Sequence, residues 1–125
     1  MSKKILIIDD EAGFTKLLRM NLERNGDYEV MIENHSVHAL KTAQDFQPDL
    51  VLLDLVMPGL DGGDVAALFQ ADPKLKKVPV IMLTALQHPM FESFSEGCDD
   101  FILKPYDETV LLKKVQEKLG SGKLN

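Results

Sequence analysis

Disulfide bonds, membrane spans and secretion signals are all missing from this chain. It has 125 residues, with one cysteine, Cys98, and no tryptophan. A single cysteine cannot form a disulfide within the chain, and no apolar run approaches the roughly 18 residues that a membrane span needs. The first apolar run begins by Ile5, so we expect no signal peptide before it. These absences favour a protein of the reducing cytoplasm.

Basic residues are also in the minority. The chain holds 14 Lys and Arg against 20 Asp and Glu, a formal net charge of -6, and no Lys/Arg-rich run. We therefore expect no direct binding to nucleic acid or to an anionic membrane surface. No repeat, low-complexity tract or linker interrupts the chain. With 45% hydrophobic residues, we predict one domain over residues 1–125. Its core should span about 3–119, and 120–125 should form a loose tail.

Five short apolar runs alternate with helix-like segments. The runs are KILII (4–8), YEVMI (28–32), LVLL (50–53), VIML (80–83) and FIL (101–103). The first, third and fourth are apolar almost throughout, which is typical of central strands in a parallel sheet covered on both faces. The alternation predicts an α/β fold, (βα)5, with a doubly wound parallel five-stranded sheet and right-handed crossovers.

The intervening segments have amphipathic patterns. The residues expected to share a helical face are Phe14, Leu17, Leu18 and Leu22, then Val65, Leu68 and Phe69, then Leu111, Leu112, Val115 and Leu119. Gly26 and Gly120 stand where helix ends favour a residue with positive φ. Asp107 is the expected N-cap of the last helix.

Polar side chains follow four of the five apolar runs. These residues are Asp9 and Asp10, Asp54, Thr84 and Lys104. In an open parallel sheet, ligands bind outside the carboxyl ends of the strands. The pattern therefore predicts that three carboxylates, one hydroxyl and one ammonium converge at one edge of the sheet.

Each of these residues alone has a structural explanation. Asp10 could cap the following helix, and Asp54 could form the turn before Pro58. Thr84 could be structural, and Lys104 could be a solvated lysine. The combination is harder to explain, because converging carboxylates repel one another unless a cation joins them.

The oxygen-rich set favours Mg²⁺, a hard ion that takes one or two carboxylates and keeps several waters. No His/Cys cluster indicates zinc or iron. His35 and His38 are expected to be exposed at the start of the second helix, and His88 is expected in a loop.

A metal beside a carboxylate nucleophile and a lysine indicates phosphoryl transfer to aspartate. Spacing separates the roles. Asp9 and Asp10 lie near Glu11 and suit a cation, whereas Asp54 stands alone and suits the phosphoryl group.

Four motifs extend this interpretation to a family. IIDDEAG, LLDLVMPGLDG, IMLTA and DDFILKP occur in this order and resemble the receiver (CheY-like) domain of bacterial two-component response regulators. The resemblance covers residues 3 to about 119. It implies the flavodoxin-like fold with strand order 2-1-3-4-5.

The resemblance also implies a role for each site residue. Asp54 would be the phosphoacceptor, Asp10 would bind Mg²⁺ directly, and Asp9 would bind it chiefly through water. The main-chain carbonyl of Val56 would be a further metal ligand. Lys104 would pair with the phosphate.

Three positions match the switch of the family. Thr84 would donate a hydrogen bond to the phosphate in the active state, and Phe101 would be the aromatic that turns inward. Ala85 would leave room at the phosphate. The Lys104–Pro105 bond is typically cis in the family.

As a receiver, the chain would accept a phosphoryl group from a sensor histidine kinase or a histidine phosphotransfer protein. It would not be an enzyme beyond self-phosphorylation and autodephosphorylation. No DNA-binding domain follows, so we expect a downstream protein partner at the face formed by the fourth helix, fifth strand and fifth helix. Two departures affect that face. Cys98 replaces the usual alanine, and the stretch between Thr84 and Lys104 is about two residues short, which shortens the fourth helix, expected at 90–96.

Three alternatives remain open from the sequence. A pseudo-receiver scaffold should lack Asp54, Asp10 or Lys104, and none is missing. If the chain is an excised receiver of a larger DNA-binding regulator, its full gene would be longer than this sequence. A metal-dependent phosphatase would need an acidic residue where Val56 stands. The resemblance also implies that Val56 and Leu86 would flank the path of water to the phosphoacceptor. Neither side chain carries a hydrogen-bonding group, which predicts slow loss of phosphate.

Overall fold

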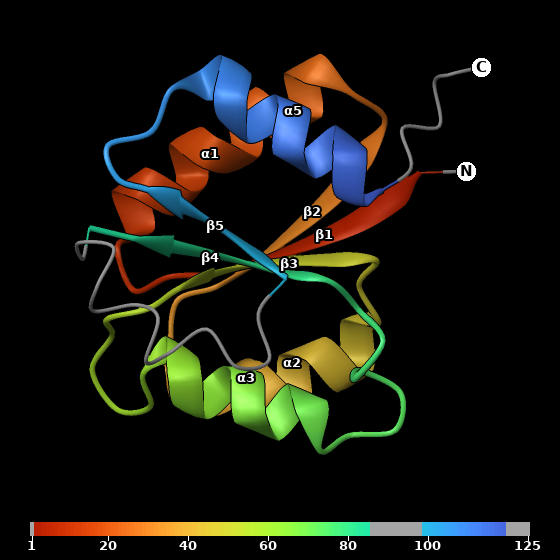
Figure 1. Cartoon of the computed structure of the whole chain (residues 1–125), viewed down its shortest axis with the longest axis vertical. Coiled ribbons are helices and arrows are strands. Elements are labelled where there is room, and N and C mark those ends of the chain that lie inside the picture. The colour runs from red at the N-terminus through yellow and green to blue at the C-terminus, as the bar shows by residue number, and fades with distance from the viewer. Residues whose placement is uncertain (1, 86–98, 120–125) are drawn as a thin grey trace.

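The computed structural model describes residues 2–85 and 99–119 and shows a three-layer α/β domain (Figure 1). The strands are β1 (Lys3–Ile8), β2 (Tyr28–Glu33), β3 (Leu50–Asp54), β4 (Val80–Thr84) and β5 (Asp100–Leu103). The helices are α1 (Ala12–Asn25), the 3₁₀ turn η1 (Ser36–His38), α2 (Ala39–Phe46), α3 (Gly62–Gln70) and α5 (Glu108–Lys118). The fourth helix expected at 90–96 and residues Leu86, His88 and Cys98 lie outside the described residues.

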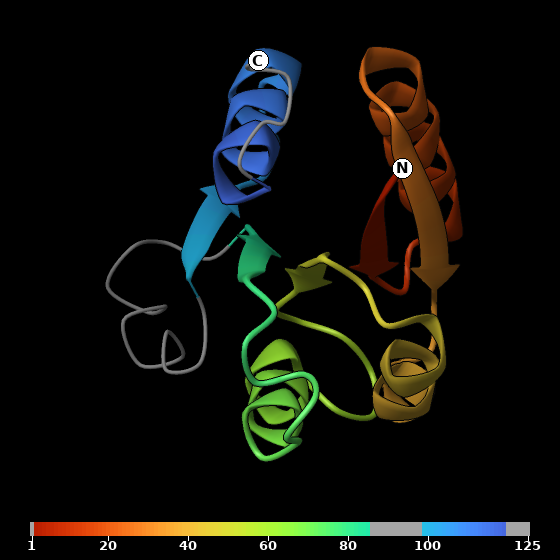
Figure 2. The same ribbon diagram turned by 90° about the vertical axis from the view of Figure 1, so that its right-hand side faces the viewer.

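The five strands form one parallel sheet in the order β2-β1-β3-β4-β5, which confirms the predicted fold. Helices α1 and α5 cover one face, and α2 and α3 cover the other (Figures 1 and 2). Both faces of the central strands therefore meet apolar side chains. Every residue of β3 and β4 is buried, as their uninterrupted apolar runs predicted.

Two hydrophobic clusters fill the layers. One includes Leu6, Val51 and Phe69, and lies between the sheet and α2 and α3. The other includes Ile5, Leu18 and Val115, and lies between the sheet and α1 and α5. Alternate residues of one strand thus enter opposite clusters, because successive side chains of a strand point to opposite faces.

Two residues of the predicted helical faces are exposed. Leu17 is 56% exposed and Leu68 is 38% exposed, whereas their neighbours Leu18 and Phe69 are buried. Consecutive helical residues point about 100° apart, so one residue of each pair takes the core position and the other flanks it. The shared helical faces therefore include exposed as well as buried positions.

The helix ends differ from prediction in one respect. Gly26 follows α1 with φ −171°, an extended conformation, so the expected positive φ is wrong. The Tyr28 ring lies against Gly26, so a Cβ there would require the ring to move.

A positive φ is found after α2, at Gln47, whose φ is 53°. Asp107 caps α5 as predicted and accepts from the amide of Thr109 at 2.8 Å. Gly120 lies outside the described residues.

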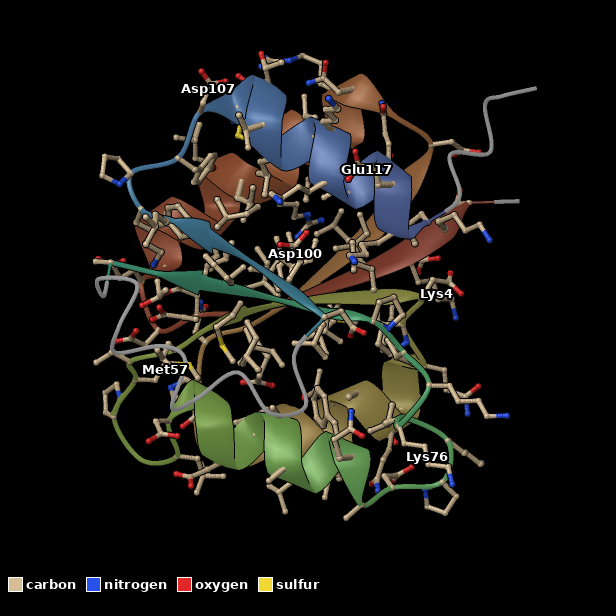
Figure 3. The ribbon with its side chains drawn as sticks, in the orientation of Figure 1. Lys4, Met57, Lys76, Asp100, Asp107 and Glu117 are labelled. Atoms are coloured by element: carbon tan, nitrogen blue, oxygen red, sulfur yellow. The ribbon has the colours of Figure 1, made fainter. Side chains whose placement is uncertain are left out.

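The labelled side chains distinguish the edge where the strands end from the edge where they begin (Figure 3). Met57 lies at the edge where the strands end, and Lys4 and Lys76 lie at the opposite edge (Figure 3). Within residues 2–85 and 99–119, no helix has both the length and the apolar character for crossing a bilayer.

Candidate phosphoacceptor site

The polar residues predicted to converge do lie together at the carboxyl edge of the sheet. One carboxylate oxygen from each of Asp9, Asp10 and Asp54 lies within 4.8 Å of the others. Asp9 is fully buried, Asp54 is 6% exposed, and Asp10 is exposed. The cluster therefore has two buried carboxylates and one that faces solvent.

Lys104 supplies the opposite charge. Its Nζ lies 2.8 Å from Asp9 Oδ2, 3.5 Å from Asp54 Oδ1 and 3.6 Å from Glu11 Oε1. The ammonium also lies 4.4 Å from the centre of the Phe14 ring, within the range of a cation–π contact. The structural alternative of a solvated lysine is therefore excluded.

Burial and charge shift two pKa values in this site. Burial, together with the negative charge of Asp9, raises the pKa of Asp54 from 3.8 to about 6, although Lys104 acts in the other direction. For Lys104, burial alone lowers the pKa, but the bond to Asp9 and the charges of Asp9 and Asp54 outweigh it, so its pKa is raised. Near neutral pH, Asp54 is mostly ionised and Lys104 is charged.

Asp10 does not cap α1. The N-cap residue is Glu11, and no side-chain oxygen caps this helix. Asp9 instead organises the turn, since its Oδ1 accepts from the Glu11 amide at 3.0 Å. The Asp10 carboxylate is thus left pointing outward beside two buried ones, which suits a direct cation ligand.

Asn34 was missed by sequence reasoning. This residue follows β2, and its Nδ2 donates to the Asp9 carbonyl at 2.7 Å and to Thr15 Oγ1 at 3.1 Å. It therefore fixes the end of β1 and the start of α1. A polar residue just after β2, at the same sheet edge, was the only signal, and no motif includes it.

The loop from Leu55 to Asp61 carries the residues after Asp54. The Gly62 amide donates to the Leu55 carbonyl at 2.7 Å, which closes the loop. A Cβ at Gly62 would lie 2.6 Å from the Asp54 carbonyl oxygen, so only glycine allows this approach. Asp61 and Asp64 form a capping box at the start of α3.

The structure also places the other residues singled out in the sequence. Thr84 ends β4 with 1% exposure, and Phe101 is partly buried against the cluster beneath α3. The Lys104–Pro105 bond is cis, as the resemblance implied. Val56 is 62% exposed beside the site. His35 and His38 are exposed at η1, away from the acidic cluster, as expected.

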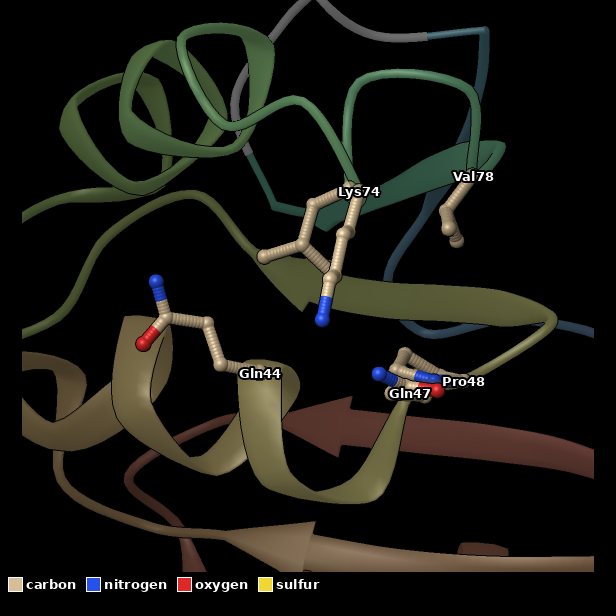
Figure 4. Close-up of a pocket in the computed structure, with 6 residues that line it drawn as sticks. Gln44, Gln47, Pro48, Lys74 and Val78 are labelled. Atoms are coloured by element: carbon tan, nitrogen blue, oxygen red, sulfur yellow. The ribbon is translucent and has the colours of Figure 1, made fainter.

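The described surface has a hollow at each edge of the sheet. One, of about 560 Å³, adjoins Lys104 and runs between Phe14 and Leu17 of α1 and Tyr106 beyond β5. The other, of about 400 Å³, lies at the opposite sheet edge between Gln47 and Lys74 (Figure 4). Only the first adjoins the acidic cluster.

A doubly wound sheet in this order, with an acidic cluster and a lysine at its carboxyl edge, defines a flavodoxin-like α/β domain with a ligand site at the usual place. Residues 5–116 match the response regulator receiver domain family. The chain therefore belongs to this family, and it is a receiver domain of two-component systems.

Two regulators are similar in sequence. The DNA-binding dual master transcriptional regulator RpaA of Synechocystis is 36% identical over 118 residues, which are 93% of this chain and 48% of RpaA. The alkaline phosphatase synthesis transcriptional regulatory protein PhoP of Bacillus subtilis is 38% identical over 126 residues, 99% of this chain and 51% of PhoP. The chain thus spans about half the length of these relatives.

Two solved receiver domains share the fold. The receiver domain of a signal transduction histidine kinase from Syntrophus aciditrophicus has a TM-score of 0.87 and 32% identity, covering 99% of this chain and 95% of that one. That of the sensor histidine kinase PA1611 from Pseudomonas aeruginosa has a TM-score of 0.87 and 24% identity, covering 97% and 100%, and holds a magnesium ion in its active-site cleft.

Proposed function

We propose that this chain is a phosphoacceptor switch that receives a phosphoryl group on Asp54. The observation that carries this proposal is that Asp54 lies beside Asp9 and Asp10 at the carboxyl edge of the sheet, with the Lys104 ammonium 2.8 Å from Asp9 and 3.5 Å from Asp54. A pKa of about 6 leaves the Asp54 carboxylate mostly ionised at neutral pH, the form that acts as a nucleophile.

The transfer is a simple displacement at phosphorus. An Asp54 oxygen forms a bond to phosphorus while the nitrogen–phosphorus bond of a phosphohistidine breaks. The released imidazole nitrogen keeps the electron pair and takes a proton from water. Lys104 stays charged and pairs with a phosphoryl oxygen, and the Thr84 hydroxyl donates to another. The same carboxylate would accept phosphate from a small acyl phosphate, which is self-phosphorylation.

The donor set fits Mg²⁺. Three carboxylates lie within reach of one ion, and all available donors are oxygens. Asp10 and Asp54 would bind the ion directly, with the Val56 carbonyl as a further ligand and Asp9 acting chiefly through water. When bound, Mg²⁺ offsets the negative charge of the transferring group. The magnesium in the PA1611 receiver occupies the cleft of a domain with the same fold.

The partners follow from this chemistry. The donor would be a sensor histidine kinase or a histidine phosphotransfer protein. A downstream protein would bind the face that includes β5 and α5, where Leu103 and Val110 are each 46% exposed. Thr84 and Phe101 would couple this face to the site. The proposed location is the cytoplasm, and absence of nucleic-acid binding by this domain stays a prediction.

A second candidate concerns the context of the domain. Both relatives are transcriptional regulators about twice as long as this chain, so it could act as the receiver half of a DNA-binding regulator. The length of the reading frame decides between this role and that of an independent receiver.

Phosphorylation of Asp54 is tested by intact-mass spectrometry after incubation with acetyl phosphate and Mg²⁺. The wild type should gain one phosphate and Asp54→Asn none. Asp45→Asn, which removes an exposed carboxylate on α2, should be labelled like the wild type. Full labelling of Asp54→Asn would refute the proposed function.

A further inference from the structure

Ser36 links the segment after β2 to the loop after Asp54. The Ser36 hydroxyl donates to the Pro58 carbonyl at 2.8 Å and accepts from the Leu60 amide at 2.9 Å. Ser36 is 4% exposed, so both bonds are shielded from water. One side-chain atom therefore holds both sides of the turn at Gly59.

This turn is tightly fitted to Ser36. Gly59 has φ 83°, and a Cβ there would lie 3.1 Å from Ser36 Oγ. The other end of the loop is held by the bond from the Gly62 amide to the Leu55 carbonyl. The loop is thus fixed at two points, and Val56 lies between Asp54 and the turn.

We propose that Ser36 is a positioning residue for the metal site, holding the loop so that the Val56 carbonyl faces the acidic cluster. This inference rests on the proposed function, which makes that carbonyl a ligand. Mg²⁺ requires near-ideal octahedral geometry with ligands at about 2.0–2.1 Å, so a small shift of the loop weakens binding. Residues behind the ligands typically change metal affinity by about 10- to 100-fold when they are mutated.

The chemistry requires a hydroxyl at this position. A serine oxygen can donate one hydrogen bond and accept others, so it satisfies a carbonyl and an amide at the same time. Alanine fills nearly the same space but leaves the Pro58 carbonyl and the Leu60 amide without this partner. The loop would then relax to find new partners, and the carbonyl would move with it.

The test is a Mg²⁺ titration of the full chain followed by amide NMR. Ser36→Ala should bind Mg²⁺ about tenfold more weakly than the wild type. Thr42→Val is the matched control, because the Thr42 hydroxyl bonds Glu33 at 2.6 Å in the same part of the fold and is not bonded to the loop. Its affinity should stay within about twofold of the wild type.

Equal affinities of Ser36→Ala and wild type would overturn the proposal, and so would an equal loss in Thr42→Val. Absence of Mg²⁺ binding by the wild type would instead refute the proposed function, and this inference with it. The two failures are therefore distinguishable.

A second measurement uses the wild type alone and does not depend on folding of the variant. Because coupling between two sites is reciprocal, bound Mg²⁺ should protect the Leu60 amide, which donates to Ser36, from hydrogen exchange. Saturating Mg²⁺ should slow this exchange about tenfold relative to the Leu75 amide, which bonds Asp72 at a distance from the site. Unchanged Leu60 exchange would overturn the proposal.

Discussion

Lys104 donates its short hydrogen bond to Asp9, at 2.8 Å, and lies farther from Asp54, at 3.5 Å. Asp9 is fully buried, so this pair is held in a region of low dielectric. One ammonium therefore serves two buried carboxylates and partly serves Glu11. Negative charge remains in excess, which underlies the predictions on metal and pH.

Mg²⁺ should stabilise the fold. An ion that binds only the folded state adds about 1.4 kcal/mol at ten times its dissociation constant, by mass action. This corresponds to a rise of about 5 °C in melting temperature. Asp10→Ala should show a much smaller rise, whereas Asp45→Asn should respond like the wild type. Differential scanning calorimetry with and without Mg²⁺ measures this, and an undiminished response in Asp10→Ala would contradict its role as a ligand.

Without metal, ionised Asp54 should destabilise the fold. Its pKa is about 6 in the folded protein and about 3.9 when unfolded, so the folded state favours the protonated form. This stabilising effect is complete below pH 4 and disappears as the pH rises through 6. Asp54→Asn should therefore exceed the wild type in stability by about 1 to 3 kcal/mol at pH 7.5, and by less at pH 4.5.

Urea denaturation in EDTA at several pH values measures the difference between these two proteins. Asp45→Asn is the control and should track the wild type at every pH. The difference in free energy of unfolding between Asp54→Asn and wild type should grow as the pH rises. If this difference stays constant or shrinks, the pKa of Asp54 is not raised.

Gly62→Ala and Gly13→Ala should have opposite effects. A Cβ at Gly62 meets the main chain of Asp54 and Leu55 at 2.6 and 2.7 Å, contacts that no rotamer change can relieve. We expect a loss of about 1 to 3 kcal/mol. Gly13 lies in α1 with nothing within 4 Å of an added Cβ, so alanine should stabilise by up to about 1 kcal/mol. Urea denaturation gives both values, and a neutral Gly62→Ala would refute the close approach.

Phosphorylation should change the surface near β5 and α5. A phosphoryl group on Asp54 should attract the Thr84 hydroxyl and favour the inward rotamer of Phe101. Beryllofluoride, which mimics the phosphoryl group, should shift amide resonances at 99–110 as well as at the site. Asp54→Asn should show none of these shifts. Wild-type shifts confined to the site would mean that the signal leaves by another face.

The phosphoryl group should be lost slowly. Val56 is 62% exposed, so it does not cover the core edge and is free to obstruct the approach of water. Introducing polar groups that orient water, in the double variant Val56→Asn, Leu86→Glu, should speed phosphate loss by roughly tenfold. Val110→Asn, at an exposed position of α5, should not change the rate. The measurement is phosphate release from purified phosphoprotein in Mg²⁺, and an unchanged rate in the double variant would refute this role.

The alternation of five strands with helices along the chain, and the edge of the sheet that carries the site, could be predicted from the sequence. Uninterrupted apolar runs identify buried parallel strands, and the carboxyl ends of parallel strands share one edge. Asp9, Asp54 and Lys104 were therefore expected at the same edge, and the strand order brings them together there. Strand order was implied by family resemblance, because periodicity within a run does not say which strand lies next to it.

Tertiary structure decided what lies between those residues. Asn34 and Ser36 reach across to the loops of β1 and β3, and contacts between distant loops leave no periodic pattern. Gly26 has an extended φ and lies against the Tyr28 ring, a contact that the local pattern does not indicate. The preference of Lys104 for Asp9 over Asp54 likewise depends on differences in distance of less than an ångström, which only the packed loops determine.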